Sequence, residues 1–220
     1  MPHTLDGSID VVLDVYHGSD ISLADAKSAG ILAVIHKASE GATVQDAKYA
    51  KRRHEARGLG LLWGAYHYAS GMPVQLQVSN FLDAVQWGAD SGLDEKTLLC
   101  LDFEPSHSGP DMSFHDVCTF VSMVREKTGR WPMIYGGALL RETFAAANPS
   151  CDAAKCPLWY ARYNDKPVGI PGLWAKFALW QYTDGANGPQ PRNINDGHFD
   201  RSCFVGTSTE LKQQWPLFRQ

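Results

Sequence analysis

The segment Leu99–Glu104 (LCLDFE) ends an apolar run in two carboxylates that are separated by one aromatic residue. Side chains at positions i and i+2 of a strand point to the same side, so we expect Asp102 and Glu104 to project together, with their Cα atoms roughly 6 to 7 Å apart. Repulsion and partial burial then raise the pKa of one carboxyl while the other stays ionised. Acid-catalysed cleavage of a glycosidic bond requires such a division into acid and anion. A strand-end acidic pair that caps a helix or faces solvent would give the same six residues.

Short apolar runs recur along the chain and are separated by helical patterns, which is typical of a parallel sheet with helices outside it. The expected strands are Val11–His17, Ile31–Ala38, Gly60–Tyr68, Thr97–Glu104, Pro132–Gly136, Leu158–Tyr163, Phe177–Thr183 and His198–Phe204. The expected helices are Leu23–Ala29, Asp46–Arg57, Val74–Gly88, Phe114–Lys127 and Ala138–Ala147. Helical periodicity disappears after about residue 150. The pattern therefore predicts an α/β fold, an irregular TIM-like β/α barrel of about eight strands, with helices incomplete in its last third.

The 220 residues are 44% hydrophobic and 20% charged, which is ordinary for one globular domain with a sizeable core. No internal repeat or linker interrupts the chain. We therefore expect residues 1–220 to form a single catalytic domain, with a barrel core at about 9–205 and a C-terminal tail at 206–220.

The charge pattern excludes several classes of partner. The net charge is −4, and the longest basic run, Lys51–Arg53, falls on an expected helix, so a nucleic-acid partner is not expected. No stretch approaches the roughly 18 apolar residues of a membrane span, and the segment from Met1 to Asp6 lacks the regions of a secretory signal. We expect a monomer without a membrane segment.

Five cysteines leave at least one unpaired. Cys100 in a strand and Cys118 in a helix are expected to be buried thiols, whereas Cys151 and Cys156 flank a short loop and can pair in an oxidising compartment. No C-x-x-C or H-E-x-x-H spacing occurs, so neither a metal nor another cofactor is expected.

In an α/β barrel the reacting groups sit at the C-terminal ends of the strands, and polar residues do follow most of the expected strands. Asp14 lies within the apolar run VVLDV, where an unpartnered carboxylate would cost several kcal/mol, so we favour a functional role over a structural salt bridge. Aromatic residues gather at the same ends, and aromatic faces stack on the C–H faces of sugar rings, which indicates a carbohydrate groove. The residues expected to contact substrate are Tyr66, His67, Tyr135, Trp159, Tyr163 and Gln181, and Asp200 lies in the eighth strand.

Six motifs occur in order along the chain: Val34–Gly41 (VIHKASEG) with Asp46 after it, Gly64–Tyr68 (GAYHY), Leu101–Glu104 (LDFE), Ile134–Gly136 (IYG), Pro157–Tyr163 (PLWYARY) and Leu179–Asp184 (LWQYTD). Together they span roughly residues 11 to 204 and resemble the glycoside hydrolase family 25 lysozymes, the Chalaropsis-type muramidases.

The resemblance implies an irregular β/α barrel that hydrolyses the β-1,4 bond between N-acetylmuramic acid and N-acetylglucosamine in peptidoglycan. By motif position, Glu104 is then the general acid, and Asp102 is the carboxylate that stabilises positive charge or orients the substrate's N-acetyl group. Asp14 and Asp200 match two further acids around the cleaved sugar. An enzyme carboxylate, the acetamido group and an activated water all stay open as the nucleophile. The separation of the carboxyl groups would constrain that choice, at roughly 5 Å for a protein nucleophile and 6.5 to 9.5 Å for inversion.

Three places depart from the family pattern. The first motif is short and lacks an amide after Asp14, so that His17 is a candidate replacement for a sugar contact; His36 takes a usually apolar position. The expected Asp-x-Asn of the last strand is Asp200-Arg201-Ser202, which weakens the assignment of Asp200.

Competing functions are a catalytically silent glycan-binding barrel, a chitinase-like enzyme and a metal-dependent barrel hydrolase. The D-x-D-x-E pattern of a chitinase is broken by Cys100, and a metal site would have to use His17, His36 and His67 with Asp14. Peptidoglycan lies outside the cytoplasm, so the expected place of action is the cell wall, extracellular or periplasmic. Without a visible signal, the protein would be made in the cytoplasm and released as an endolysin, or injected as an effector with a delivery or immunity partner; removal of a signal from a longer precursor also fits.

Overall fold

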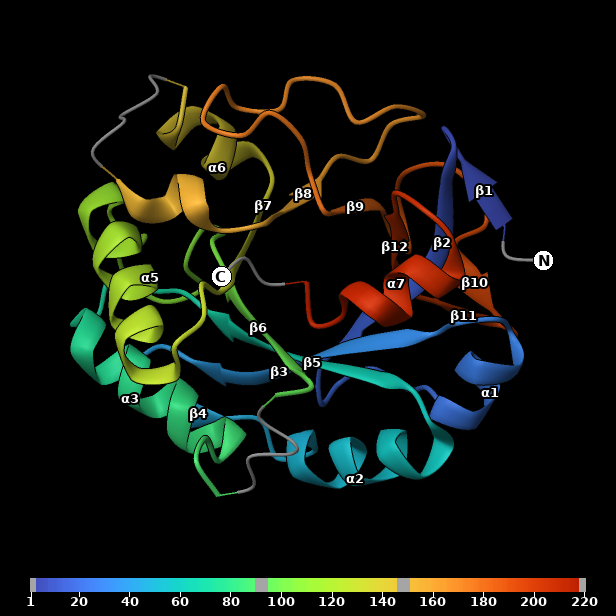
Figure 1. The fold of residues 1–220 in the computed structure, drawn as a ribbon, viewed down its shortest axis with the longest axis horizontal. Coiled ribbons are helices and arrows are strands. Elements are labelled where there is room, and N and C mark those ends of the chain that lie inside the picture. The colour runs from blue at the N-terminus through green and yellow to red at the C-terminus, as the bar shows by residue number, and fades with distance from the viewer. Residues whose placement is uncertain (1–2, 90–94, 146–150, 218–220) are drawn as a thin grey trace.

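Eight strands close into a barrel in the computed structural model, which describes residues 3–89, 95–145 and 151–217 (Figure 1). Their spatial order follows the chain, and pairing of β2 with β3 closes the ring. The strands are β2 (Ser8–Val15), β3 (Ala33–Glu40), β5 (Leu62–Tyr68), β6 (Thr97–Asp102), β7 (Met133–Gly136), β8 (Leu158–Ala161), β9 (Leu179–Asp184) and β12 (Asp200–Phe204). Every expected strand is present, so the predicted barrel is confirmed.

The last strand of the barrel runs against the others. Neighbouring strands from β2 through β9 pair in parallel, whereas β12 is antiparallel to both β9 and β2. A parallel strand delivers its C-terminal end to the rim that carries function. Because β12 is reversed, it delivers its first residue, Asp200, to that same rim, where Asp200 pairs in register with Asp14.

Helices cover the first two thirds of the barrel. They are α1 (Leu23–Ser28), α2 (Tyr49–Leu59), α3 (Val74–Val85), α5 (Phe114–Thr128) and α6 (Ala138–Thr143), with the 3-10 helix η1 (Asp152–Lys155) before β8. All five expected helices form, although α6 ends earlier than expected and residues 146 and 147 lie outside the described residues. Between β8 and β12 the described chain has no helix, as the lost periodicity predicts. Within the described residues no helix has the length and apolar character needed to cross a membrane.

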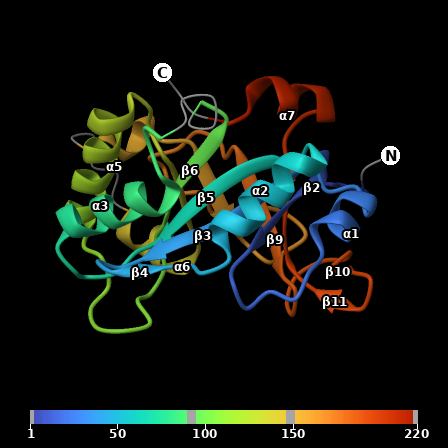
Figure 2. The ribbon, with the colours of Figure 1, turned by 90° about the horizontal axis from the view of Figure 1, so that it is seen from below.

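The expected C-terminal tail contains a further helix, α7 (Ser208–Gln214). Thr207 and Glu210 form a capping box at its start, and Trp215 donates its indole N–H to the carbonyls of Trp63 and Lys96. The helix thereby lies across the end of the barrel where β5 and β6 begin (Figure 2). Leu211 is the one buried residue of this helix, so its sequence has no apolar periodicity that would predict a helix.

Strand alternation builds two apolar layers. Val12, Ile35, Leu98 and Cys100 point into the barrel, and the next residues along the strands, such as Leu99, pack outward against the helices. The same period places Asp102 inside the barrel mouth.

Where helices are missing, polar contacts and a hairpin cover the outer face of the barrel. The Arg201 guanidinium pairs with the Asp10 carboxylate at 2.8 Å, and the Tyr182 hydroxyl donates to the same carboxylate at 2.8 Å. The hairpin of β10 (Asn193–Ile194) and β11 (Gly197–His198) lies over this region, where the Asn193 carbonyl accepts from Arg201. Two further short strands pair antiparallel with barrel strands: β1 (His3–Leu5) with β2, and β4 (Val44–Gln45) with β3. Arg201 thus faces away from the rim. The replacement of the expected Asp-x-Asn by Asp200-Arg201-Ser202 therefore places an arginine in the packing of the outer face of the barrel.

The disulfide between Cys151 and Cys156 that the sequence left open does not form. Cys118 of α5 is bonded to Cys151, with their Cα atoms 5.6 Å apart, whereas Cys100, Cys156 and Cys203 are buried and form no disulfide. η1 separates the two cysteines of the loop: Cys151 meets α5, and the Cys156 carbonyl accepts the indole N–H of Trp174. Cys118 is therefore not the free thiol that its helical position indicated, and Cys100 is.

Candidate active site

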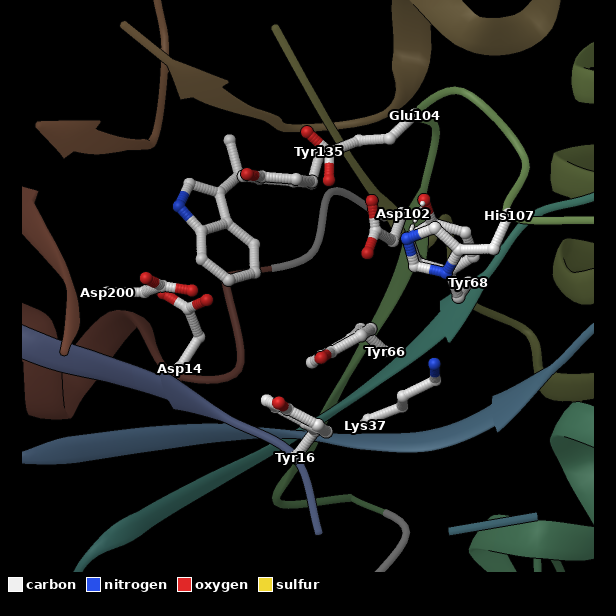
Figure 3. Close-up of a pocket in the computed structure, with 11 residues that line it drawn as sticks. Asp14, Tyr16, Lys37, Tyr66, Tyr68, Asp102, Glu104, His107, Tyr135 and Asp200 are labelled. Atoms are coloured by element: carbon white, nitrogen blue, oxygen red, sulfur yellow. Dashed lines mark hydrogen bonds between the residues drawn. The ribbon is translucent and has the colours of Figure 1, made fainter. Parts of the chain in front are cut away.

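A cavity of about 270 Å³ opens at the rim where the parallel strands end (Figure 3). It brings together the four carboxylates expected from sequence, together with three of the expected aromatic residues. Its lining comprises Asp14, Tyr16, Lys37, Tyr66, Tyr68, Asp102, Glu104, His107, Tyr135, Trp159 and Asp200.

The end of β6 fixes the first acid pair. The backbone N–H of Phe103 donates to the Tyr135 carbonyl, and the Asp102 carbonyl accepts from Ala69, so the strand end is tied on both sides. Phe103 packs outward in the helix-facing layer, which turns the residues on either side of it, Asp102 and Glu104, into the cavity.

Asp102 is 6% exposed, and its Oδ1 atom has no hydrogen-bond partner among the described residues. Burial, followed by the charges of Glu104 and Asp14, raises the pKa of Asp102 well above its usual range, while Lys37 acts in the opposite direction. A buried acceptor without a partner is costly unless a ligand satisfies it. Asp102 thus offers a free oxygen to whatever occupies the cavity.

Glu104, the second carboxylate of the first acid pair, is largely buried. Burial and then the charge of Asp200 raise the pKa of Glu104, whereas a hydrogen bond with the Tyr135 hydroxyl lowers it. The net upward direction means that Glu104 holds its proton to a higher pH than an exposed glutamate does. The pKa is raised for both carboxyls of the first acid pair, which differs from the expected division into one raised and one ionised group, because both are withdrawn from water.

Asp14 and Asp200 form a second acid pair, which lies across the pocket from Asp102 (Figure 3). They share a hydrogen bond, which requires a proton on one of them, and the Gln181 amide donates to both Asp14 oxygens at 3.0 and 3.1 Å. Burial and the charge of Asp200 raise the pKa of Asp14 well above its usual range. Burial, followed by the charge of Asp184, raises the pKa of Asp200 to about 6.

Gln181 connects this pair to the aromatic wall. Its Oε1 atom accepts from the hydroxyls of Tyr135 at 2.7 Å and Tyr163 at 2.9 Å. The Trp159 indole donates to the Ser202 hydroxyl at 2.9 Å, and its ring lies 4.6 Å from that of Tyr135. Gln181 and Tyr163 therefore position lining residues and are not themselves among the cavity lining.

Four lining residues were not among the expected site residues: Tyr16, Lys37, Tyr68 and His107. The His107 ring stacks on the Tyr68 ring at 4.4 Å, and the Lys37 ammonium lies 4.9 Å from the centre of the same ring while pairing with Glu40. Side chains two positions apart on a strand face the same way, so the position of Tyr66 predicts that Tyr68 also faces the cavity. His107 lies in the loop after β6, which has no such periodicity.

His67 is not brought to the cavity. It is fully buried on the outer face of β5, where its ring stacks on Phe120 and its nitrogens contact the Ser39 hydroxyl at 2.8 Å and the Gln77 amide oxygen at 3.2 Å. Its neighbour Tyr66 faces inward, so alternation along the strand sends His67 outward.

The three histidines of the metal-site alternative point to separate places. His36 is buried against Arg52, and His17 contacts the Asp46 carboxylate at 3.0 Å, while His67 packs under α3 and α5. Across residues 3–89, 95–145 and 151–217, no three His, Cys, Asp or Glu side chains are grouped as metal ligands.

Comparisons with known proteins agree with this architecture. Residues 13–190 match the family described as Glycosyl hydrolases family 25. The uncharacterized protein YegX of Escherichia coli O157:H7 is 31% identical over 179 residues, which cover 80% of this chain and 60% of YegX. The N,O-diacetylmuramidase of Chalaropsis sp is 28% identical over 200 residues, covering 85% of this chain and 93% of that protein.

A solved structure shows the same fold. The family GH25 lysozyme from Aspergillus fumigatus is 28% identical, with a TM-score of 0.75 over 94% of this chain and 98% of that one. The chain spans about three fifths of the length of the YegX proteins that it matches. The match over 178 of the 220 residues, from 13 to 190, carries the first acid pair within it, and it shows that this chain belongs to glycosyl hydrolases family 25.

Proposed function

We propose that this chain is a muramidase that hydrolyses the β-1,4 bond between N-acetylmuramic acid and N-acetylglucosamine in peptidoglycan, without a cofactor. The observation that carries the proposal is the acid pair of β6: a buried Glu104 with a raised pKa stands beside a buried Asp102 with a free oxygen. The name of the Chalaropsis relative, a muramidase, supports the same substrate class.

Glu104 is the proposed general acid. Cleavage of a glycosidic bond needs a proton on the leaving oxygen, and a group can supply it only while it is protonated at working pH. The buried position of Glu104 and the nearby negative charge of Asp200 favour its protonated form. After the transfer the Tyr135 hydroxyl, whose proton is directed at Gln181 Oε1 in this structure, can turn to stabilise the Glu104 carboxylate.

Asp102 is the proposed stabilising or substrate-orienting carboxylate. Positive charge develops on the sugar ring in the transition state, and the ionised form of Asp102, which the Lys37 charge favours, interacts with it far more strongly in the cavity than it would in water. The free Oδ1 atom is also an acceptor for the N–H of the substrate's acetamido group. Both roles use the same atom.

Asp14 and Asp200 are proposed to face the cleaved sugar from the other side of the cavity. Their shared proton limits the negative charge of this wall, and Gln181 holds Asp14 in place. Trp159, Tyr66 and Tyr135 supply aromatic and hydroxyl surface to the same sugar.

The proposed enzyme acts as a monomer on glycan strands in the cell wall, with one catalytic domain over residues 1–220. The Cys118–Cys151 bridge supports action in an oxidising place outside the cytoplasm. The protein reaches the wall by export, by release on lysis of the producing cell, or by injection together with a delivery or immunity partner.

The test uses purified protein on a peptidoglycan suspension. We expect falling turbidity and new reducing ends at muramic acid, identified by mass analysis of the released fragments. Glu104→Gln and Asp102→Asn should each lower kcat by about 10² to 10⁴-fold with an unchanged circular dichroism spectrum, while Asp165→Asn, at an exposed loop carboxylate, keeps full activity. Full activity of Glu104→Gln would remove the proposed general acid, and fragments with other ends would refute the bond assignment.

A further inference from the structure

The ring of Tyr16 is exposed at the edge of the cavity. Tyr16 follows β2, two residues after Asp14, and 46% of its surface is accessible although it contributes to the cavity lining. Figure 3 shows it below Tyr66, apart from the carboxylates. A single exposed apolar side chain is ordinary on a protein surface. Tyr16 differs because its ring lines the cavity that holds the carboxylates.

The backbone that carries this ring is held firmly. The buried Arg52 guanidinium donates to the carbonyls of Tyr16 at 2.8 Å and Ser19 at 2.6 Å, and the Tyr16 N–H donates to the Ser19 hydroxyl at 3.1 Å. The next residue, His17, donates its N–H to the Asp46 carboxylate at 2.8 Å. Burial would raise the pKa of Asp46, but backbone donors at Lys48 and His17 outweigh it and hold that pKa low, so Asp46 remains an acceptor.

The ring itself rests on a glycine. A Cβ atom added to Gly18 would lie 2.5 to 2.6 Å from three atoms at the far end of the Tyr16 side chain. The His17 ring meets the Tyr16 ring edge-on at 5.1 Å. Gly18 does not adopt a left-handed conformation, so its backbone does not require glycine. The lack of a side chain at this position instead leaves room for the Tyr16 ring.

We propose that the face of Tyr16 is a saccharide subsite, on which a pyranose ring of the glycan strand stacks next to the sugars that undergo cleavage. The inference rests on the proposed function and adds a binding contact that this function does not require. Peptidoglycan strands are polymers, so a cleft that cleaves within them must accommodate sugars beyond the reacting bond. Holding an exposed ring in one place lowers the entropy cost of stacking, and the contacts of Arg52, Asp46 and Gly18 do so.

Binding to an inactive parent separates this contact from catalysis. The probe is a tetrasaccharide of alternating N-acetylglucosamine and N-acetylmuramic acid, titrated calorimetrically into Glu104→Gln protein. Tyr16→Ala in that parent should weaken binding by about 3- to 10-fold, whereas Tyr16→Phe, which keeps the ring, should match the parent. Gly18→Ala should weaken binding although Tyr16 is intact, because the added methyl displaces the ring.

Gly172→Ala is the matched control, since a Cβ atom at Gly172 meets nothing within 4 Å, and it should bind as the parent does. In the active protein, Tyr16→Ala should raise KM and leave kcat within about twofold. If Tyr16→Ala or Gly18→Ala bound the tetrasaccharide as tightly as the parent does, the subsite would be overturned. It would also be overturned if Tyr16→Phe lost as much affinity as Tyr16→Ala, because the effect would then belong to the hydroxyl. A parent that binds no tetrasaccharide would refute the proposed function itself.

Discussion

Replacing Asp200 by asparagine should make the protein more stable at neutral pH, even though it removes a residue of the candidate site. The unfolded chain ionises this carboxyl at its ordinary pKa of 3.8, whereas burial and then the charge of Asp184 raise the pKa to about 6 in the folded protein. A raised carboxyl pKa makes folding less favourable once the unfolded chain has ionised and the folded one has not. The asparagine has no proton to lose, and its oxygen still accepts from Asp14.

The magnitude follows from the pKa difference. About two units at 1.36 kcal/mol each correspond to a gain of ~3 kcal/mol in the free energy of unfolding at pH 7. Well below pH 3.8 the carboxyl is protonated in both states, so the gain should approach zero there and should already be small at pH 3.5. It should grow between pH 4 and pH 6, the window that the two pKa values define, and remain constant above it.

Urea unfolding followed by circular dichroism, at pH values from 3.5 to 7.5, measures this difference. Asp165→Asn, which alters an exposed carboxylate, should change the free energy of unfolding by less than about 0.5 kcal/mol at every pH. A variant that is no more stable than wild type at pH 7 would refute the reasoning. A gain that is equally large at pH 3.5 would also refute it, because the electrostatic cause requires an ionised carboxylate.

Two further predictions concern other parts of the fold. The double variant Cys118→Ser, Cys151→Ser opens a loop of 33 residues and should lower the free energy of unfolding, measured in urea, by about 3 to 4 kcal/mol. Reductant should cause the same loss in the wild-type protein. An unchanged free energy of unfolding would contradict the bridge. Tyr135→Phe removes the hydroxyl whose hydrogen bond lowers the pKa of Glu104, so the alkaline limb of the pH profile of kcat/KM should move to higher pH. Tyr163→Phe is the control and should leave this limb in place, because the Tyr163 hydroxyl contacts Gln181 and not Glu104. A limb that stays fixed in Tyr135→Phe would show that this hydroxyl does not tune the acid.

The sequence predicted those features that follow from local period. Apolar runs marked the eight strands, and period 2 around Phe103 placed Asp102 and Glu104 on one side, as the structure shows. The same period sends the adjacent side chains of Tyr66 and His67 to opposite faces of β5, so that Tyr66 and Tyr68 line the cavity and His67 does not.

Features that depend on contacts distant in sequence could not be predicted. An apolar run does not encode the direction of its strand, so the reversal of β12 was invisible, and Asp200 was doubted because of its neighbours Arg201 and Ser202. The partner of Cys151 lies 33 residues away, on a helix that meets η1 only in the folded protein. His107 reaches the cavity from a loop whose path depends on its contact with Tyr68.

The antiparallel pairing of β12 with β2 also determines when the site comes into existence. Asp14 and Asp200 meet through strands at opposite ends of the barrel's chain order, so the wall that they form cannot assemble before β12 has left the ribosome and the ring has closed. At roughly 5 to 20 residues per second, synthesis of the intervening chain takes on the order of ten seconds or more. A nascent chain that has passed Glu104 contains Asp14, Asp102 and Glu104 but still lacks Asp200, the fourth carboxylate of the cavity. The carboxylate pair of Asp14 and Asp200 is therefore a product of barrel closure and cannot exist in a partly synthesised chain.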